Sequence, residues 1–105
     1  MAFWDHLNTL ALADFRPGVL SRAELGQDLV MACLEIGPGL ADEGHEHPFE
    51  QCGVLISGRM EMFIGDERRV LTPGQAYFIP AGARHGWRTL DEPARLLDVC
   101  ARPAG

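Results

Sequence analysis

The chain has 105 residues, which predicts one domain over residues 1–105. A hydrophobic content of 47% with 23% charged residues is that of an ordinary globular domain, and excludes a disordered chain, a fibre and a coiled coil. The net charge is −6 and the nine basic residues, all arginines, are scattered, which predicts neither a nucleic acid partner nor a membrane surface as partner.

The first residues lack the basic and long apolar regions of a secretory signal, so a cytoplasmic location is expected. A short amphipathic helix is predicted over residues 3–12. From there on, short β-rich stretches alternate with glycine and proline turns. They predict strands at 29–36, 52–56, 59–64, 67–71, 75–79, 85–90 and 94–101. This number and spacing of strands favours an all-β sandwich or barrel.

Three cysteines, Cys33, Cys52 and Cys100, each lie in an apolar, strand-like stretch. Their odd number and the lack of a Cys-x-x-Cys pair indicate buried, reduced thiols rather than a disulfide framework. A thiol ligand or nucleophile is the alternative, and Cys100 is the better candidate for it.

Residues 44–51 read Gly-His-Glu-His-Pro-Phe-Glu-Gln. In an extended strand, residues two apart point to the same face, so His45 and His47 would project side by side and suit one metal ion. Gln51 has the same parity, provided that Pro48 does not disturb the register. Glu50 has the opposite parity and is the alternative fourth ligand.

A third histidine follows a turn that is rich in proline and glycine. His85 comes after a predicted strand and the Pro80-Ala81-Gly82 turn, which would return the chain toward the first two histidines. Three of the four histidines of the chain therefore lie in two turn-bounded places.

The two stretches together resemble the two sequence motifs of the cupins, specifically the small, single-domain, RmlC-like type. The first motif, G…HxHxxx[E/Q]…G, is matched by His45, His47, Gln51 and Gly58. The second, GxxxxxPxGxxH, is matched by Gly74, Pro80, Gly82 and His85. The resemblance covers residues 44–87; Thr89 stands where the second motif often has Asn.

The resemblance implies a double-stranded β-helix, or jelly-roll barrel, that holds one divalent metal ion through His45, His47, Gln51 and His85. A cupin that binds no metal is the alternative. Three imidazoles and an amide are neutral, so the ion would keep its full charge, which favours Lewis-acid chemistry over redox cycling. Zinc, nickel, iron, manganese and cobalt all stay open.

The last predicted strand carries an acidic residue among apolar ones. Asp98 shares a face with Leu96 and Cys100. It is either paired with Arg95 or Arg102, or exposed at an edge, or it is a pocket carboxylate with a raised pKa that serves as a general acid and base. Trp87 shares parity with His85 and either lines the substrate pocket or packs in the core.

The chain also resembles the small cupins of pectin and alginate breakdown, which open unsaturated uronates to linear keto sugars. It shares with them the HxHPxEQ, GxxYFIPxGxxHG and LLDV stretches. In that subgroup an Asp, an aromatic residue two positions later and a downstream Arg serve the reaction. Here these positions hold Asp98, Cys100 and Ala104.

Three functions follow from these patterns. The first is a metal-dependent isomerase, lyase or ring-opening enzyme that acts on a small oxygenated or carboxylate substrate, with Asp98 moving protons and with Trp87 and Cys100 in the substrate pocket. The second is an iron-dependent dioxygenase, and the third is a non-catalytic module that binds a small ligand or a metal. A homodimer is expected, with the first ~28 residues as natural contributors.

Overall fold

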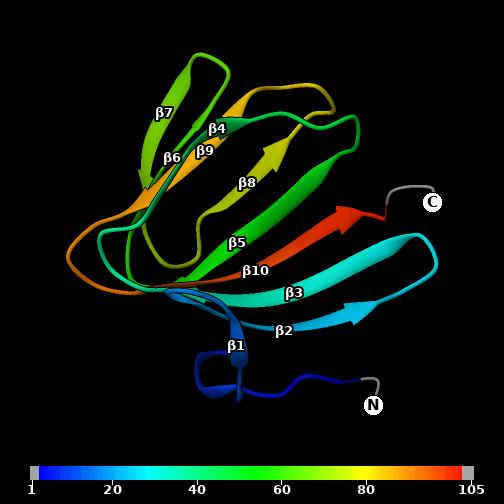
Figure 1. Ribbon diagram of the computed structural model, residues 1–105, viewed down its shortest axis with the longest axis vertical. Helices are drawn as coiled ribbons and strands as arrows, with labels where there is room; N and C mark the ends of the chain where they lie inside the picture. Colours follow the sequence, from blue (N-terminus) through cyan, green and yellow to red (C-terminus); the bar gives the residue numbers. More distant parts are fainter. Residues whose placement is uncertain (1–2, 103–105) are drawn as a thin grey trace.

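The computed structural model describes residues 3–102, which form two antiparallel sheets. The elements are η1 (Leu7–Thr9), β1 (Ala13–Arg16), β2 (Val19–Leu25), β3 (Leu29–Ile36), β4 (Ala41–His45), β5 (Gln51–Ser57), β6 (Met60–Ile64), β7 (Glu67–Leu71), β8 (Ala76–Ile79), β9 (His85–Thr89) and β10 (Ala94–Ala101). One sheet has the order β1-β2-β3-β10-β5-β8 and the other has the order β4-β9-β6-β7 (Figure 1). The two sheets form the jelly-roll barrel that the sequence predicts.

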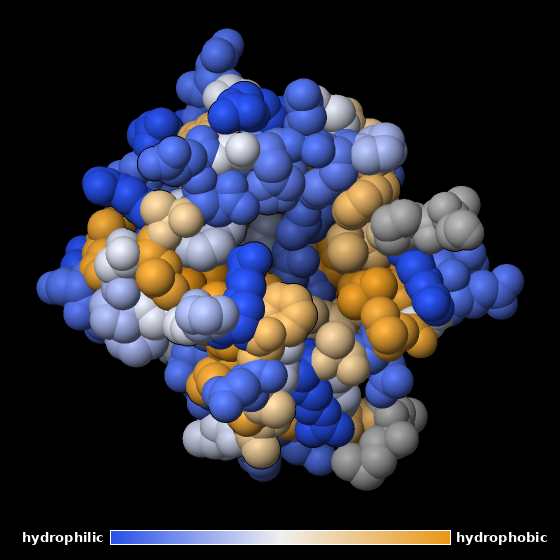
Figure 2. All heavy atoms as spheres, in the orientation of Figure 1, coloured by the Kyte–Doolittle hydropathy of each residue, from blue (hydrophilic) through white to orange (hydrophobic). Residues whose placement is uncertain are grey.

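The core lies between the two sheets and is built from side chains that alternate along the strands. In β8, for example, Tyr77 and Ile79 are buried whereas Phe78 is exposed. In β6, Met60 and Met62 are buried. This period of two is the pattern of a strand with one face on a core. On the face shown in Figure 2, apolar side chains also border the hollow near the middle of the molecule.

Glycines of the two motifs shape the turns that bring the motifs together. Gly58, Gly74 and Gly82 have φ values of 78°, 90° and 80°, a region that favours glycine. The backbone N–H of Gly82 donates a hydrogen bond to the carbonyl oxygen of His47 over 2.8 Å. The turn of the second motif is therefore tied directly to the histidine loop of the first.

All seven predicted strands are present, and each bound differs from the prediction by one residue at most. Three strands were not predicted: β1, β2 and β4. Their burial patterns explain this, because β1 is exposed throughout and β4 alternates only between exposed and half-buried residues. β1 and β4 are strands because of the strands that they pair with, whereas in β2 only Val19 is buried.

The predicted helix over residues 3–12 is wrong, and only the three-residue turn η1 forms there. His6, before the turn, adopts the left-handed region with φ 51° and makes no side-chain cap. The carbonyl oxygens of Leu7 and Leu10 accept hydrogen bonds from Arg95 Nη1 at 2.8 and 3.0 Å. The side chain of Arg95 in β10, rather than hydrogen bonds within a helix, thus holds this segment in place. No helix within residues 3–102 is long and apolar enough to span a membrane.

Candidate metal centre

Three histidines converge at one end of the four-stranded sheet. His45 ends β4, His85 begins β9, and these two residues are direct register partners. His47 lies two residues beyond β4, so the prediction that both histidines of the first motif lie in one strand is wrong. The candidate ligand atoms of all three histidines nevertheless lie within 4.8 Å of one another. The bend after β4 turns His47 toward the same point.

Each imidazole is held through its Nδ1 atom by an oxygen that can only accept. The Nδ1 atom of His47 lies 2.8 Å from the Phe49 carbonyl oxygen, and that of His85 lies 3.0 Å from the Ala83 carbonyl oxygen. His45 Nδ1 lies 3.0 Å from a carboxylate oxygen of Asp42. Because carbonyls and carboxylates accept, Nδ1 carries the hydrogen in each ring. The Nε2 lone pairs are then available to a metal, as is usual for histidine ligands.

Asp42 is well suited to this orienting role. Partial burial raises its pKa, but hydrogen bonds from the Gly44 N–H and from His45 outweigh burial and hold the pKa of Asp42 below its ordinary value. The carboxylate therefore stays ionised and keeps the His45 ring in place.

His85 has a buried ring nitrogen without a hydrogen-bond partner. Its side chain is only 3% exposed, and within residues 3–102 its Nε2 is the buried side-chain nitrogen or oxygen that has no hydrogen-bond partner. Burial lowers the pKa of His85, so the ring stays neutral and its lone pair stays free. An unsatisfied buried nitrogen is costly, and a metal ion at the centre would satisfy it.

Gln51, the first residue of β5, brings a fourth candidate metal ligand from the opposite sheet. Its Oε1 lies 2.9 Å from His47 Nε2. Its amide nitrogen donates to both oxygens of Asp98, at 3.0 and 2.8 Å, so the amide oxygen must face the histidines. Two acceptor atoms that face each other need a proton or a cation between them. Glu50, the alternative ligand in the sequence, is exposed.

Asp98 lies one step behind Gln51 and is 7% exposed. Besides the Gln51 amide it accepts a short hydrogen bond from the Tyr77 hydroxyl. The alternative of a surface or arginine-paired Asp98 is wrong, because Arg95 pairs with Glu35 and Arg102 donates to a backbone carbonyl. Burial raises the pKa of Asp98, against the opposing effect of the hydrogen bonds from Tyr77 and Gln51.

The geometry of this centre agrees with the comparison to known families. The model of the cupin domain family matches residues 33–100, which contain all four candidate ligands. The chain belongs to the cupin family. The residues fit one divalent cation, because three imidazole nitrogens and one amide oxygen lie close together with lone pairs available to it.

This cupin is similar to several known proteins. It is 32% identical to the pectin degradation protein KdgF of Dickeya dadantii over 73 residues, which are 69% of this chain and 66% of that protein. It is 28% identical to the H2HPP isomerase of Bacillus subtilis over 99 residues, which are 92% of this chain. The matches span 66% of KdgF and 42% of the isomerase, so the chain covers less than two thirds of either curated relative.

A solved structure of KdgF from Halomonas superposes on this cupin with a TM-score of 0.80. The superposition covers 92% of both chains at 24% sequence identity. At this identity the likeness establishes the fold, and it extends beyond the residues that the family model matches.

A cavity of about 100 Å³ adjoins the metal centre. His45, Gln51, His85 and Asp98 line it, and so does Trp87, which also packs against the core. Both readings of Trp87 are therefore compatible with its position. Cys100 is half-buried next to Gln51 in register and is not among the lining residues of this cavity. Ala104 lies outside the described residues.

Tyr77 is a residue of the site that the sequence reasoning missed. Burial and then the neighbouring Asp98 raise its pKa, so it stays a hydroxyl that donates. Its register partner Gly53 explains how the ring fits, since a Cβ on Gly53 would collide with the Tyr77 hydroxyl. The pairing of Gly53 with both Tyr77 and Asp98 could have been found only from the register of β5 between β8 and β10.

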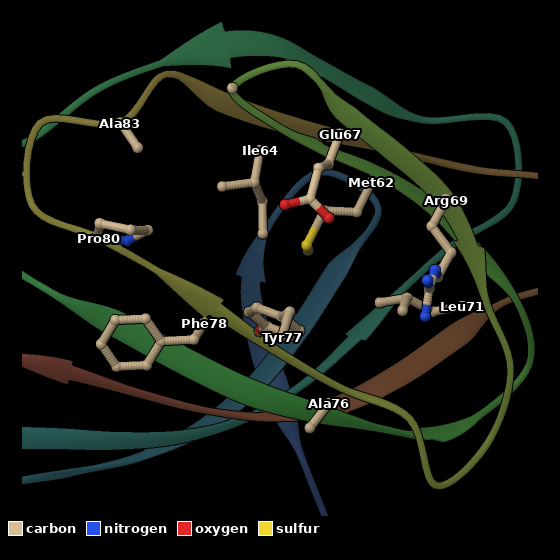
Figure 3. Close-up of a pocket in the computed structure, with 11 residues that line it drawn as sticks. Met62, Ile64, Glu67, Arg69, Leu71, Ala76, Tyr77, Phe78, Pro80 and Ala83 are labelled. Carbon is tan, nitrogen blue, oxygen red and sulfur yellow. The ribbon is translucent and has the colours of Figure 1, made fainter.

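A larger groove of about 470 Å³ lies between β8 and the β6–β7 hairpin (Figure 3). The strands β7 and β8 are edge strands of the two sheets. Glu67 and Arg69 border the groove, with Met62 and Tyr77 at its base (Figure 3). Met62 and Tyr77 also line the smaller cavity, so these two side chains separate the groove from the metal centre.

Proposed function

We propose that this cupin is a metal-dependent enzyme of the isomerase, lyase or ring-opening type. His45, His47, Gln51 and His85 would hold one divalent ion, which when bound supplies a Lewis acid for a substrate oxygen. The observation that carries the proposal is the 2.9 Å approach of His47 Nε2 to Gln51 Oε1, with both atoms left as acceptors by their other hydrogen bonds.

The residues of the chain supply the remaining requirements of such a reaction. Asp98 is the carboxylate that lines the cavity, and its proton affinity is raised by burial. In the proposed ring opening, Asp98 accepts the proton of the hemiacetal hydroxyl as the ring C–O bond breaks, and delivers it to the former olefinic carbon, which leaves a linear keto sugar. The Tyr77 hydroxyl and the Gln51 amide fix the carboxylate during both transfers. Most of the other side chains that line the cavity are apolar.

The similarity to KdgF and to the H2HPP isomerase supports this class of reaction, and uronate ring opening is the first activity to assay. The reaction conserves the atoms of its substrate, so a proton-transfer group and an oxyanion-stabilising ion suffice for it. No oxidant is required.

The first test is the metal content of the purified protein by elemental analysis. We expect about one divalent ion per chain, lost in His47→Ala and retained in His6→Ala, which changes the one histidine outside the cluster. Equal metal content in His47→Ala and wild type would contradict the proposed ligand set. No binding of added divalent ions by wild type would contradict the enzyme proposal as a whole.

The second test is ring opening of a 4,5-unsaturated uronate, followed by NMR through the loss of its olefinic proton. Asp98→Asn should lower the rate by a factor of about 10²–10⁴, the usual contribution of a general acid or base. Asp91→Asn is the matched control, because Asp91 is 85% exposed. A rate in Asp98→Asn equal to that of wild type, with metal content retained, would remove Asp98 from the mechanism.

A further inference from the structure

The edge strand β1 brings an arginine to the metal cavity. Arg16 lines the same cavity as His45, Gln51 and Asp98. Of the described residues that line the cavity, Arg16 alone carries a permanent positive charge. Because Asp98 is the only acidic side chain among the described residues that line the cavity, its charges come from Arg16, Asp98 and any bound ion.

A bulge in β1 explains why Arg16 reaches the cavity. Consecutive residues of a regular strand point to opposite faces, yet Phe15 and Arg16 both line this cavity. The register of β1 on β2 shifts between Asp14 and Arg16, and Arg16 pairs with the buried Val19. Bulges often redirect a side chain in this way beside functional sites. The shift lets both residues take part in the lining of the cavity, where Arg16 is also exposed to solvent.

The guanidinium group has no partner of its own among residues 3–102. No hydrogen bond or ion pair joins Arg16 to a described side chain, and its nearest aromatic ring is that of Phe15, 5.7 Å away. Other arginines of the chain are engaged: Arg95 pairs with Glu35, and Arg68 and Arg88 pair with Glu61. The five donors of Arg16 are free for a ligand.

The charge balance of the cavity favours an anion. The four neutral ligand groups leave the full charge of a divalent ion at one end, and Arg16 adds a further positive charge, against the single negative charge of Asp98. The chain as a whole carries −6, so the positive charge of a metal-loaded cavity would be a local feature. A carboxylate matches the fork of a guanidinium group in shape and charge.

We propose that Arg16 anchors a carboxylate of the substrate while a second, oxygen-bearing group of the substrate faces the metal ion. The inference rests on the proposed function, because it takes the ion as the second anchor. A cavity of about 100 Å³ is far smaller than the usual pockets of roughly 300–1,000 Å³, so the ligand portion that it takes is a short carboxylic acid of a few carbons.

The test uses the cobalt(II)-loaded protein and a series of short diacids: malonate, succinate and glutarate, each compared with its monoamide. Calorimetry gives the dissociation constants, and the visible spectrum of cobalt(II) reports coordination. We expect the best diacid to bind wild type about ten- to a hundredfold more tightly than its monoamide. In Arg16→Gln this preference should disappear, and Arg16→Lys should retain part of it.

The matched control is Arg22→Gln, since Arg22 on β2 stacks on Trp4 and does not line the cavity. It should keep the wild-type preference. Equal preference in Arg16→Gln and wild type, or an equal loss of affinity for diacid and monoamide, would overturn the inference. A protein that binds cobalt(II) but no diacid would also overturn the inference, and the proposed metal site would still stand. A protein that binds no cobalt(II) would overturn the proposed function, and the inference with it.

Discussion

The contact between Gln51 and Asp98 predicts why the fourth donor is an amide and not a carboxylate. Both Asp98 oxygens accept from the Gln51 nitrogen, at 3.0 and 2.8 Å, in a buried place. Gln51→Glu replaces that donor with a second carboxylate. At about 3 Å and an effective dielectric constant of about 20, two such charges repel by about 5 kcal/mol. Like charges at this distance do not both ionise, so proton uptake limits the cost.

We therefore expect Gln51→Glu to lower the free energy of unfolding by about 3–5 kcal/mol at pH 7 in the metal-free protein. The lost hydrogen bonds to a charged group account for about 1.5–3 kcal/mol of this. Asp98→Asn alone should cost about 1–3 kcal/mol, because an Asn that accepts from Tyr77 turns its own N–H groups toward Gln51. The double variant should recover at least about 2 kcal/mol, since Asn at 98 then donates to Glu at 51.

The assay is urea unfolding followed by tryptophan fluorescence, with a chelator present so that no metal contributes. The control is Gln75→Glu, which makes the same chemical change at an exposed position and should stay within about 0.5 kcal/mol of wild type. A loss below about 1 kcal/mol in Gln51→Glu would refute the reasoning. Additive losses in the double variant would refute it equally.

Three other predictions concern the rest of the chain. Arg95→Met should remove the bonds that hold residues 7–10, lower stability by about 2–4 kcal/mol and speed amide hydrogen exchange in that segment; unchanged exchange would contradict this. The two arginines that hydrogen-bond to Glu61 lower its pKa below 4.5, so the difference in Tm between wild type and Glu61→Gln should be present above pH 4.5 and vanish as the pH falls further. Burial raises the pKa of Cys33, which should react with a maleimide last of the three thiols, as mass spectrometry would show.

The sequence predicts the strands that have an apolar period of two and the turns that have glycine or proline. The stretch 67–71 is bounded correctly because its glycine turn and its residues agree locally. The stretch 41–45 is polar and contains a glycine, so nothing local marks it as β4. It becomes a strand by pairing with β9, whose partner residues lie forty or more positions away. Sequence patterns describe local preferences, and such pairing is not local.

The candidate ligands illustrate the same limit within one site. The three histidines and Gln51 are brought together, but strand parity is not the reason for Gln51, since a bend separates it from β4 and it lies in the other sheet. Its amide is oriented by Asp98, 47 positions later, which is oriented in turn by Tyr77. No spacing rule links residues across three strands, so Tyr77 could not be predicted as part of the site.

The chain of contacts from Tyr77 through Asp98 to Gln51 also determines where the negative charge lies. A glutamate at position 51 would place that charge on the metal ion itself, whereas here it lies on Asp98, one side chain farther away. The total charge of the interior is the same in both arrangements, but in this one the ion keeps its full attraction for a substrate oxygen. The double variant Gln51→Glu with Asp98→Asn moves the charge without changing the total. It should therefore bind a divalent ion more tightly than wild type. Because Asp98→Asn by itself removes the proton-transfer group, the rate is compared with that single variant, and the double variant should be slower still. Tighter metal binding with a rate above that of Asp98→Asn would contradict Lewis-acid catalysis by this centre.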